Sequence, residues 1–264
     1  MYDASWHYLK QTISALLWLF LIAPSYACEN GTALISGGPN YPPLTWRVGN
    51  GLVGANVKLA KLLFAEVEID AQADEGGPWK RVLLRARRGK LDLLLGVRKN
   101  LERERYLTFI EPPITPSVQS VFTSTDRTFH YQEWQDLSGK IGGVTLGTSF
   151  GKIFDTFAKE QLQIEQARTM KQNFNKLNLG RIDYLLGPLM TTILYTRLTG
   201  FDDMIIHKTA PLMVINEYLA IPKNSTCHQY IEHFSKRVNE VQLDGSYDLL
   251  LEEYFILWES KLNY

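Results

Sequence analysis

The turn at residues 147–149 combines residue types that bind anions. It lies in the segment 137–151, LSGKIGGVTLGTSFG, which reads as a loop, a short strand and a glycine-rich turn that opens a helix near Ser149. A turn at Gly147 exposes backbone N–H groups, and the start of a helix attracts negative charge. We therefore predict that the backbone at 147–149 and the hydroxyl group of Thr148 bind an anion. Thr148 is also a candidate helix N-cap.

The sequence carries no signature of a metal site, a cofactor site or a catalytic nucleophile. The five histidines form no His-Glu-x-x-His pair, and His228 and His233 are five residues apart instead of the four of a helical zinc site. The segment 147–152 is one residue short of a phosphate loop, and no serine lies in a Gly-x-Ser-x-Gly turn. We therefore expect no metal, no cofactor and no enzymatic activity.

The elements that must position this turn are those of an α/β protein. Short apolar runs alternate with helical patterns along the 264 residues. The segment 92–97, in which an uninterrupted apolar run follows Asp92, is typical of a strand that is buried on both faces. The 28 basic and 28 acidic residues balance, which argues against a protein that binds nucleic acid or an acidic membrane. The expected strands are 32–36, 68–73 and 92–97, the expected helices are 57–67 and 79–88, a second α/β unit covers 139–215, and 226–258 is mostly helical.

The N-terminus is expected to be a signal peptide, residues 1–27. Lys10 precedes an apolar run at 13–23, and small residues precede a cleavage site after Ala27. The run is too short for a helix that spans a bilayer, although a retained signal anchor is the alternative. Cleavage there would make Cys28 the first residue. Cys28 and Cys227 are the two cysteines, so we expect a disulfide in an exported protein, with lipidation of Cys28 as the alternative.

A set of short motifs occurs in one order along the chain, and each is weak alone. Together they resemble bacterial extracytoplasmic solute-binding proteins of family 3, the amino-acid branch that serves ABC importers. The motifs are the turn segment 137–149, YPPLTW at 41–46, GLVGANV at 51–57, Trp79 with GKLD at 89–92, GVRKNLER at 96–103, FIEPP at 109–113, LGRID at 179–183, LAIPK at 219–223 and DGSY at 244–247.

The resemblance implies a type II periplasmic binding protein fold, in which two α/β lobes close on a ligand. Lobe 1 would comprise residues 28–115 and, after a second crossing near 216–220, residues 217–264; lobe 2 would comprise 116–216. The implied function is capture of a small carboxylate-bearing solute, an amino acid or a related anion, in the periplasm. The implied partner is an ABC permease in the inner membrane, and the protein is expected to be a monomer.

The resemblance also implies which residues bind the ligand. Arg103 matches the arginine that pairs with the ligand carboxylate, which suits the planar guanidinium group; a surface ion pair is the alternative. Backbone groups near Gly96 and the turn at 147–149 would complete the anion site. The aromatic walls would come from Tyr41, Trp46 and Trp79, although Trp79 also fits an ordinary core position. The implied ligand-binding residues are Arg103, Tyr41, Thr148, Gly96, Arg98, Trp79, Ser149 and Trp46.

The chain departs from the family pattern at two positions. Pro188 stands where amino-acid binders carry an acid for the ligand's ammonium group, and Arg98 stands where a small hydroxyl residue is common. These changes favour a ligand without an α-ammonium group or with a second anionic group, although Glu217 could supply the missing carboxylate. Two alternative functions stay open, a dehydratase of cyclohexadienyl compounds, with Glu217 or Glu111 as acid-base group, and an exported ligand-sensing module.

Overall fold

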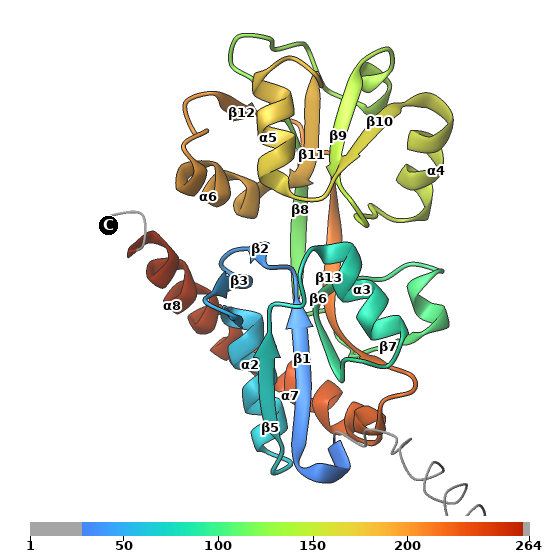
Figure 1. The fold of residues 1–264 in the computed structure, drawn as a ribbon, viewed down its shortest axis with the longest axis vertical. Helices are drawn as coiled ribbons and strands as arrows, with labels where there is room; N and C mark the ends of the chain where they lie inside the picture. Colours follow the sequence, from blue (N-terminus) through green and yellow to red (C-terminus); the bar gives the residue numbers. More distant parts are fainter. Residues whose placement is uncertain (1–27, 261–264) are drawn as a thin grey trace, which may run out of the picture.

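The computed structural model describes residues 28–260, which form two α/β lobes joined by two long strands (Figure 1). The expected signal peptide lies outside the described residues. The strands β8 (Thr115–Ser124) and β13 (Met213–Pro222) pair antiparallel and connect the lobes. Both crossings implied by the resemblance are therefore present. The residue numbers at which the lobes divide stay a prediction.

The remaining elements form two lobes, and lobe 1 is completed by the C-terminal helices. Lobe 1 contains η1 (Cys28–Asn30), β1 (Thr32–Gly37), β2 (Asn40–Tyr41), β3 (Thr45–Val48), β4 (Gly51–Val53), α2 (Ala55–Ala65), β5 (Asp70–Asp74), α3 (Trp79–Arg87), β6 (Leu93–Arg98), η2 (Arg103–Arg105) and β7 (Leu107–Phe109). Lobe 2 contains η3 (Trp134–Leu137), β9 (Ile141–Thr145), α4 (Lys152–Gln161), β10 (Gln163–Ala167), α5 (Met170–Asn178), β11 (Tyr184–Pro188), α6 (Leu189–Thr199) and β12 (Ile205–His207). The chain returns to lobe 1 with η4 (Thr226–Tyr230), α7 (Ile231–Leu243) and α8 (Ser246–Ser260).

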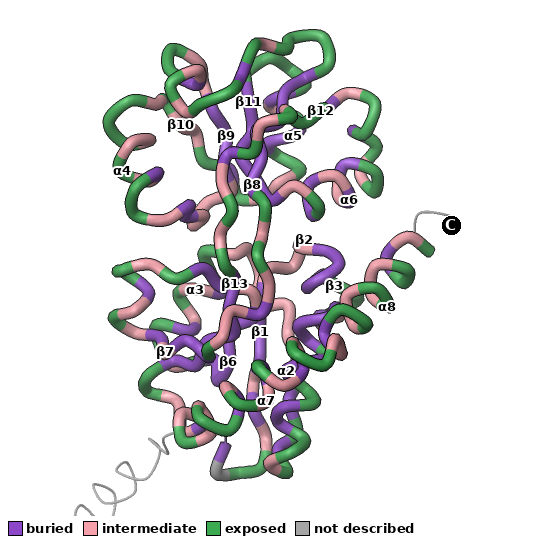
Figure 2. Tube along the Cα trace, turned by 180° about the vertical axis from the view of Figure 1, so that it is seen from behind, coloured by how far each residue is buried: buried purple, intermediate pink, exposed green. Residues whose placement is uncertain are grey.

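The core of lobe 1 follows from its apolar runs. Strand β1 pairs parallel with both β5 and β6, and the apolar residues of β6 are buried, as the uninterrupted run predicted. Helix α2 buries one face against this sheet, including Leu59, Leu63 and Phe64. In Figure 2 the buried residues follow the strands of both lobes, whereas the outer helices carry most of the exposed ones.

Lobe 2 repeats the parallel pattern, with β9 between β10 and β11. Its glycines permit close packing, since a Cβ atom at Gly142 would lie 2.5 Å from the ring of Tyr184. Helix α4 begins at Lys152 with Gly151 as its N-cap, three residues later than the start predicted near Ser149. The residues 147–150 form a longer loop because the carboxylate of Asp155 reaches back to the Ser149 hydroxyl group and the Phe150 amide.

The long strands β8 and β13 make one 13-stranded sheet out of the strands of both lobes. The β13 register places Glu217 opposite Arg98 of β6 and opposite Thr115 of β8. Strand β8 pairs with β11 of lobe 2, where Gln119 lies opposite Pro188. Side chains from both lobes are therefore brought together where the strands cross from one lobe to the other.

The start of the described chain is joined to η4, as predicted, by a disulfide between Cys28 and Cys227, with the two Cα atoms 5.3 Å apart. Its formation excludes lipidation of the Cys28 sulfur. Helix α8 packs against α2 and α7 and carries Trp258 at its far end. Among residues 28–260, no helix is both long and apolar enough to span a bilayer.

Candidate functional site

A cavity of about 400 Å³ lies between the lobes. Residues of β2, α3 and β6 line it from lobe 1, and residues of β11 and the loops after β9 and β10 line it from lobe 2. Seven of the eight expected ligand-binding residues belong to its lining: Tyr41, Trp79, Gly96, Arg98, Arg103, Thr148 and Ser149. A volume of this size fits a small metabolite, and the walls are mixed polar and apolar, as is usual for such sites.

Arg103 is the first residue of η2 and is 4% exposed. Its Nη1 atom donates to the Arg98 carbonyl oxygen (2.7 Å), and its Nη2 atom donates to the Gly147 carbonyl oxygen of lobe 2 (3.0 Å). The guanidinium carbon lies 5.8 Å from the centre of the Trp79 ring. Burial lowers the pKa of Arg103 to about 10, so the group stays charged at neutral pH.

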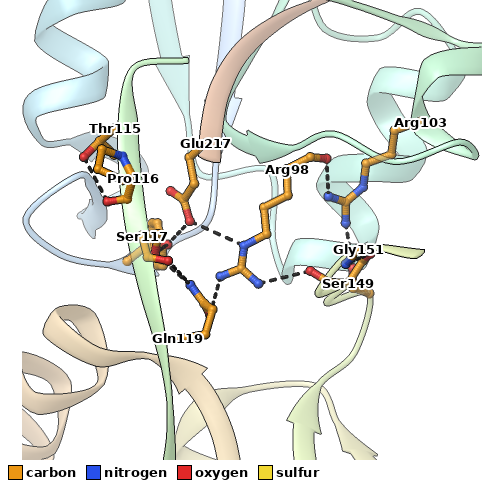
Figure 3. A network of polar contacts seen from close by, with 11 residues as sticks. Arg98, Arg103, Thr115, Pro116, Ser117, Gln119, Ser149, Gly151 and Glu217 are labelled. Atoms are coloured by element: carbon orange, nitrogen blue, oxygen red, sulfur yellow. Dashed lines mark hydrogen bonds and ion pairs between the residues drawn. The ribbon is translucent and has the colours of Figure 1, made fainter. Parts of the chain in front are cut away.

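Arg98 connects the two lobes through three different partners (Figure 3). Its Nη1 atom donates to the Ser149 carbonyl oxygen (3.1 Å) and its Nη2 atom to Oε1 of Gln119 (2.8 Å). Its Nε atom lies 3.5 Å from Oε1 of Glu217. The guanidinium group also stacks on Phe150, 5.5 Å from the ring centre. Arg98 thus has a fixed position in the cavity wall.

Glu217 is 1% exposed and its Oε1 atom accepts a hydrogen bond from the Tyr41 hydroxyl group. Its Oε2 atom has no hydrogen-bond partner among the described residues. Burial raises the pKa of Glu217, and Arg98 and Tyr41 oppose that effect. Burial, together with the nearby Glu217, also raises the pKa of Tyr41, which stays neutral and donates its proton. Such a buried carboxyl group beside a cavity is a candidate for acid-base chemistry.

The backbone at Gly96 leaves little room for a side chain beside Glu217. Gly96 has a φ of +63°, and a Cβ atom there would lie 3.2 Å from Nδ2 of Asn56 and 3.6 Å from Oε2 of Glu217. A side chain at position 96 would therefore be strained in its backbone and would crowd both polar groups. Gly96 keeps this part of the cavity open.

The turn at 147–149, expected to offer N–H groups to an anion, uses one of them internally and also presents carbonyl oxygens. The Thr148 amide donates to the Thr145 carbonyl oxygen within the turn. The carbonyl oxygens of Gly147 and Ser149 accept from Arg103 and Arg98. The turn therefore presents carbonyl acceptors to lobe 1, and the arginines of lobe 1 supply positive charge to the site. Thr148 is not the N-cap of α4 either, because that position belongs to Gly151.

Trp46 is a correction to the expected aromatic walls. It is absent from the lining of the cavity and is 2% exposed. Its ring packs edge-on against those of Trp258 and Tyr254 of α8, at centre-to-centre distances of 5.3 and 5.9 Å. Trp46 directly precedes exposed Arg47 in β3, so the two side chains point to opposite faces of the strand, and Trp46 packs against the C-terminal helix. Tyr41 and Trp79 do line the cavity.

Three residues that line the cavity or support its wall were not among those expected to bind, and Gln119 is the one that lies behind the lining. Gln119 is fully buried and bonds Arg98, and its amide nitrogen donates to the Ser117 hydroxyl oxygen (2.8 Å). The alternation of Ser117 and Gln119 along β8 is the signal that would have placed both on one face. Arg168 lines lobe 2 from the loop before α5, and no pattern in the sequence marked it. Glu217 was identified as a possible acid but not as a binding residue.

The two-lobed α/β architecture with an interlobe cavity defines the type II periplasmic binding protein fold, which confirms the predicted fold class. The chain belongs to the bacterial extracellular solute-binding proteins, family 3, which match residues 34–256. A comparison with curated protein sequences gave no match.

Solved structures with the same fold perform different tasks. One is an amino-acid ABC transporter substrate-binding protein from Streptococcus pneumoniae bound to L-arginine, with 19% identity, coverage of 88% of this chain and 98% of that chain, and a TM-score of 0.74. Another is a histidine kinase sensor domain, with 18% identity, coverage of 84% of this chain and 95% of that chain, and a TM-score of 0.71. A third is an ancestral amino-acid-binding protein described as a precursor of cyclohexadienyl dehydratase, with 20% identity, coverage of 86% of this chain and 96% of that chain, and a TM-score of 0.69. The fold alone therefore does not choose among these tasks.

Proposed function

We propose that this protein is a periplasmic receptor that captures a small carboxylate-bearing solute between its lobes and delivers it to an ABC permease of the inner membrane. The observation that carries the proposal is the environment of Arg103. Its guanidinium group is buried, lines the cavity and has no acidic partner among residues 28–260. A buried cation without a counterion is costly, and an anionic ligand would supply that counterion.

The hydrogen bonds of Arg103 support the same role. Two of its five N–H groups donate to the Arg98 and Gly147 carbonyl oxygens, which fixes the guanidinium plane. The remaining N–H groups are available for a carboxylate. Because the Gly147 contact comes from lobe 2, closure of the lobes and binding of the anion would be coupled through this side chain.

The test is the affinity of Arg103→Ala for any carboxylate that stabilises the wild type. Ligand carried over from expression is first removed by unfolding and refolding, and thermal shifts are then recorded. We expect Arg103→Ala to lose at least about 2 kcal/mol of binding free energy, roughly thirtyfold in Kd. Arg103→Lys keeps the charge but loses the planar donor pair and should also bind weakly.

Arg105→Ala is the matched control, because Arg105 lies in the same short helix, is exposed and does not line the cavity. Circular dichroism and melting temperature must show that the Arg103 variants are folded, since Arg103 also bonds the backbone. Binding by a folded Arg103→Ala protein within a factor of a few of the wild type would refute the anchor role.

A second candidate function, a dehydratase, is favoured by Glu217. This carboxyl group lines the cavity, has an unpartnered oxygen and has a raised pKa because it is buried. An enzyme of this kind would protonate the hydroxyl group of a hydroxylated cyclohexadienyl carboxylate, so that water leaves and the ring carboxylate is lost as carbon dioxide; the aromatic product absorbs in the ultraviolet. Turnover by the wild type that is lost in Glu217→Gln would replace the receptor proposal; binding without turnover would exclude the dehydratase.

A further inference from the structure

The charged residues of the cavity do not balance. Four arginines line it, Arg47, Arg98, Arg103 and Arg168, against two acids, Glu75 and Glu217. Where a side chain of the cavity is buried, as Arg98, Arg103 and Glu217 are, an uncompensated charge on the protein or on the ligand beside it is unfavourable. The sign and number of the unpaired side chains therefore restrict the charge of the ligand.

Both acids of the cavity are already engaged by arginines of the same cavity. Glu217 lies beside Arg98, with Nε and Oε1 3.5 Å apart, and both side chains are buried. Glu75 pairs with Arg47 at the rim (3.4 Å). If Glu217 is ionised, Arg98 neutralises it; if it is protonated, it carries no charge. In neither state does the Arg98–Glu217 pair carry a net negative charge, so the Oε2 atom, unpartnered among the described residues, can accept a hydrogen bond but supplies no counterion for an ammonium group.

The wall contributed by β11 provides no replacement. Its lining residues are Leu185, Leu186, Gly187 and Pro188, none of which is charged. An ammonium group placed against this wall would lose its hydration without gaining an anionic partner. The cavity is thus unsuited to a ligand with a free amino group.

Two arginines are left without an acid, one on each lobe. Arg103 belongs to lobe 1, and Arg168 belongs to lobe 2, directly before the N-cap residue Thr169 of α5. Arg168 is exposed where it lines the cavity, and no ion pair holds its guanidinium group in the part of the chain that the structure describes, so this group is free to contact a ligand. Planar guanidinium groups are suited to carboxylates, and two of them on separate lobes would bind the two ends of one ligand.

We infer that the ligand is a small dicarboxylate without an amino group, with one carboxylate bound by Arg103 and the other by Arg168. This inference rests on the proposed function, since it specifies the ligand of the same receptor. Arg168 becomes the specificity residue, because a monocarboxylate would use Arg103 alone. Each lobe binds one end of the ligand, so the dicarboxylate also holds the lobes together.

The test uses ligands that differ by one group. The refolded protein is titrated calorimetrically with dicarboxylates of increasing chain length, from succinate to suberate, with their amino counterparts L-aspartate and L-glutamate, and with the monocarboxylates butyrate and valerate. We expect a dicarboxylate to bind at least about tenfold more tightly than its amino counterpart and its monocarboxylate. Arg168→Gln should weaken the dicarboxylate about tenfold or more and leave the monocarboxylate unchanged.

Two further variants sharpen the result. Arg181→Gln is the matched control, since Arg181 is an exposed arginine of lobe 2 outside the cavity lining. Pro188→Asp places a negative charge on the uncharged wall, and aspartate also suits the helix N-cap position that Pro188 occupies before α6. This variant should favour L-glutamate over glutarate.

The outcomes separate the two proposals. If L-amino acids bind best and Arg103→Ala abolishes that binding, the receptor function stands and the dicarboxylate inference is wrong. If a dicarboxylate binds but Arg168→Gln has no effect, the role of Arg168 is wrong. If no carboxylate binds at all, both proposals fail.

Discussion

At the scale of single residues, Glu217 makes the stability of the protein depend on pH. Burial raises its pKa above the usual 4.5. A carboxyl group whose pKa is higher in the folded than in the unfolded protein holds its proton more tightly when folded. Folding stability is therefore lost as the pH rises from the usual value through the raised one.

In Glu217→Gln, residue 217 cannot titrate. The loss of the carboxylate beside Arg98 changes the free energy of unfolding by the same amount at every pH, so it does not reproduce the pH dependence caused by Glu217. We expect the free energy of unfolding of the variant, minus that of the wild type, to increase as the pH rises through this window and then to level off. Urea unfolding at a series of pH values from about 4 to 8 measures it. A constant difference, or one that decreases, would contradict the assigned environment of Glu217.

The residue scale is also where the sequence predicted least. Tyr41 and Arg103 were placed by motifs, and both line the cavity. Trp46 lies only five positions from Tyr41, yet it faces α8 and not the cavity. The face to which a strand residue points depends on how the strand pairs, and the helix that covers that face is remote in sequence. Gln119 and Arg168 were missed since their roles depend on strand register and on the other lobe. Alternation along β8 could have placed Gln119 on the same face as Ser117, but neither its contact with Arg98 nor the position of Arg168 beside the cavity is encoded in local spacing.

At the scale of elements, most of the chain was predictable. The apolar run of β6 and the helical periodicity of α2 and α3 identified those elements within a few residues. The start of α4 was misplaced because the side chain of Asp155 bonds the loop before it. The two crossings between the lobes, made by β8 and β13, were implied by resemblance alone, and the single sheet that these strands form was not predicted, since long-range pairing leaves no local pattern.

The disulfide is the element-scale feature with a measurable energy. It joins η1 to η4 across 199 residues, and Cys227 is fully buried. Closing so long a loop restricts the unfolded chain, for which the typical stabilisation is about 2–5 kcal/mol. We expect the double variant Cys28→Ser, Cys227→Ser to unfold at lower denaturant concentration by that amount. The wild type in reducing agent should match it, and an unchanged midpoint would contradict a structural role.

At the scale of the whole molecule, the lobes also touch outside the ligand cavity. Leu194 of α6 in lobe 2 is 1% exposed and packs in one apolar cluster with Trp46 and Trp258 of lobe 1. Beside it, the Thr191 hydroxyl group donates to the Pro42 carbonyl oxygen (3.0 Å), and Arg197 lies 3.7 Å from Glu259. The exposed ion pair contributes little, so the apolar cluster accounts for most of this contact.

This cluster should bias the equilibrium between open and closed lobes. Opening would return Leu194, Trp46 and Trp258 to water, so their burial favours the closed arrangement whether or not the cavity holds a ligand. Leu194→Ala removes the lobe 2 side of the contact and leaves the two tryptophans in place. We expect a larger radius of gyration in small-angle scattering, a red-shifted tryptophan emission and weaker ligand binding, along with a loss of about 2–5 kcal/mol in unfolding free energy.

Leu198→Ala is the control, because Leu198 lies one turn later on the same helix and is 43% exposed. Its substitution shortens an equivalent side chain without affecting the cluster, so the scattering curve should match that of the wild type. A Leu194→Ala protein that loses stability but keeps the wild-type radius of gyration would show that the cluster stabilises α6 within its own lobe. Closure would then depend on the polar contacts between the lobes, chiefly the bonds that Arg98 and Arg103 donate to the Ser149 and Gly147 carbonyl oxygens across the cavity.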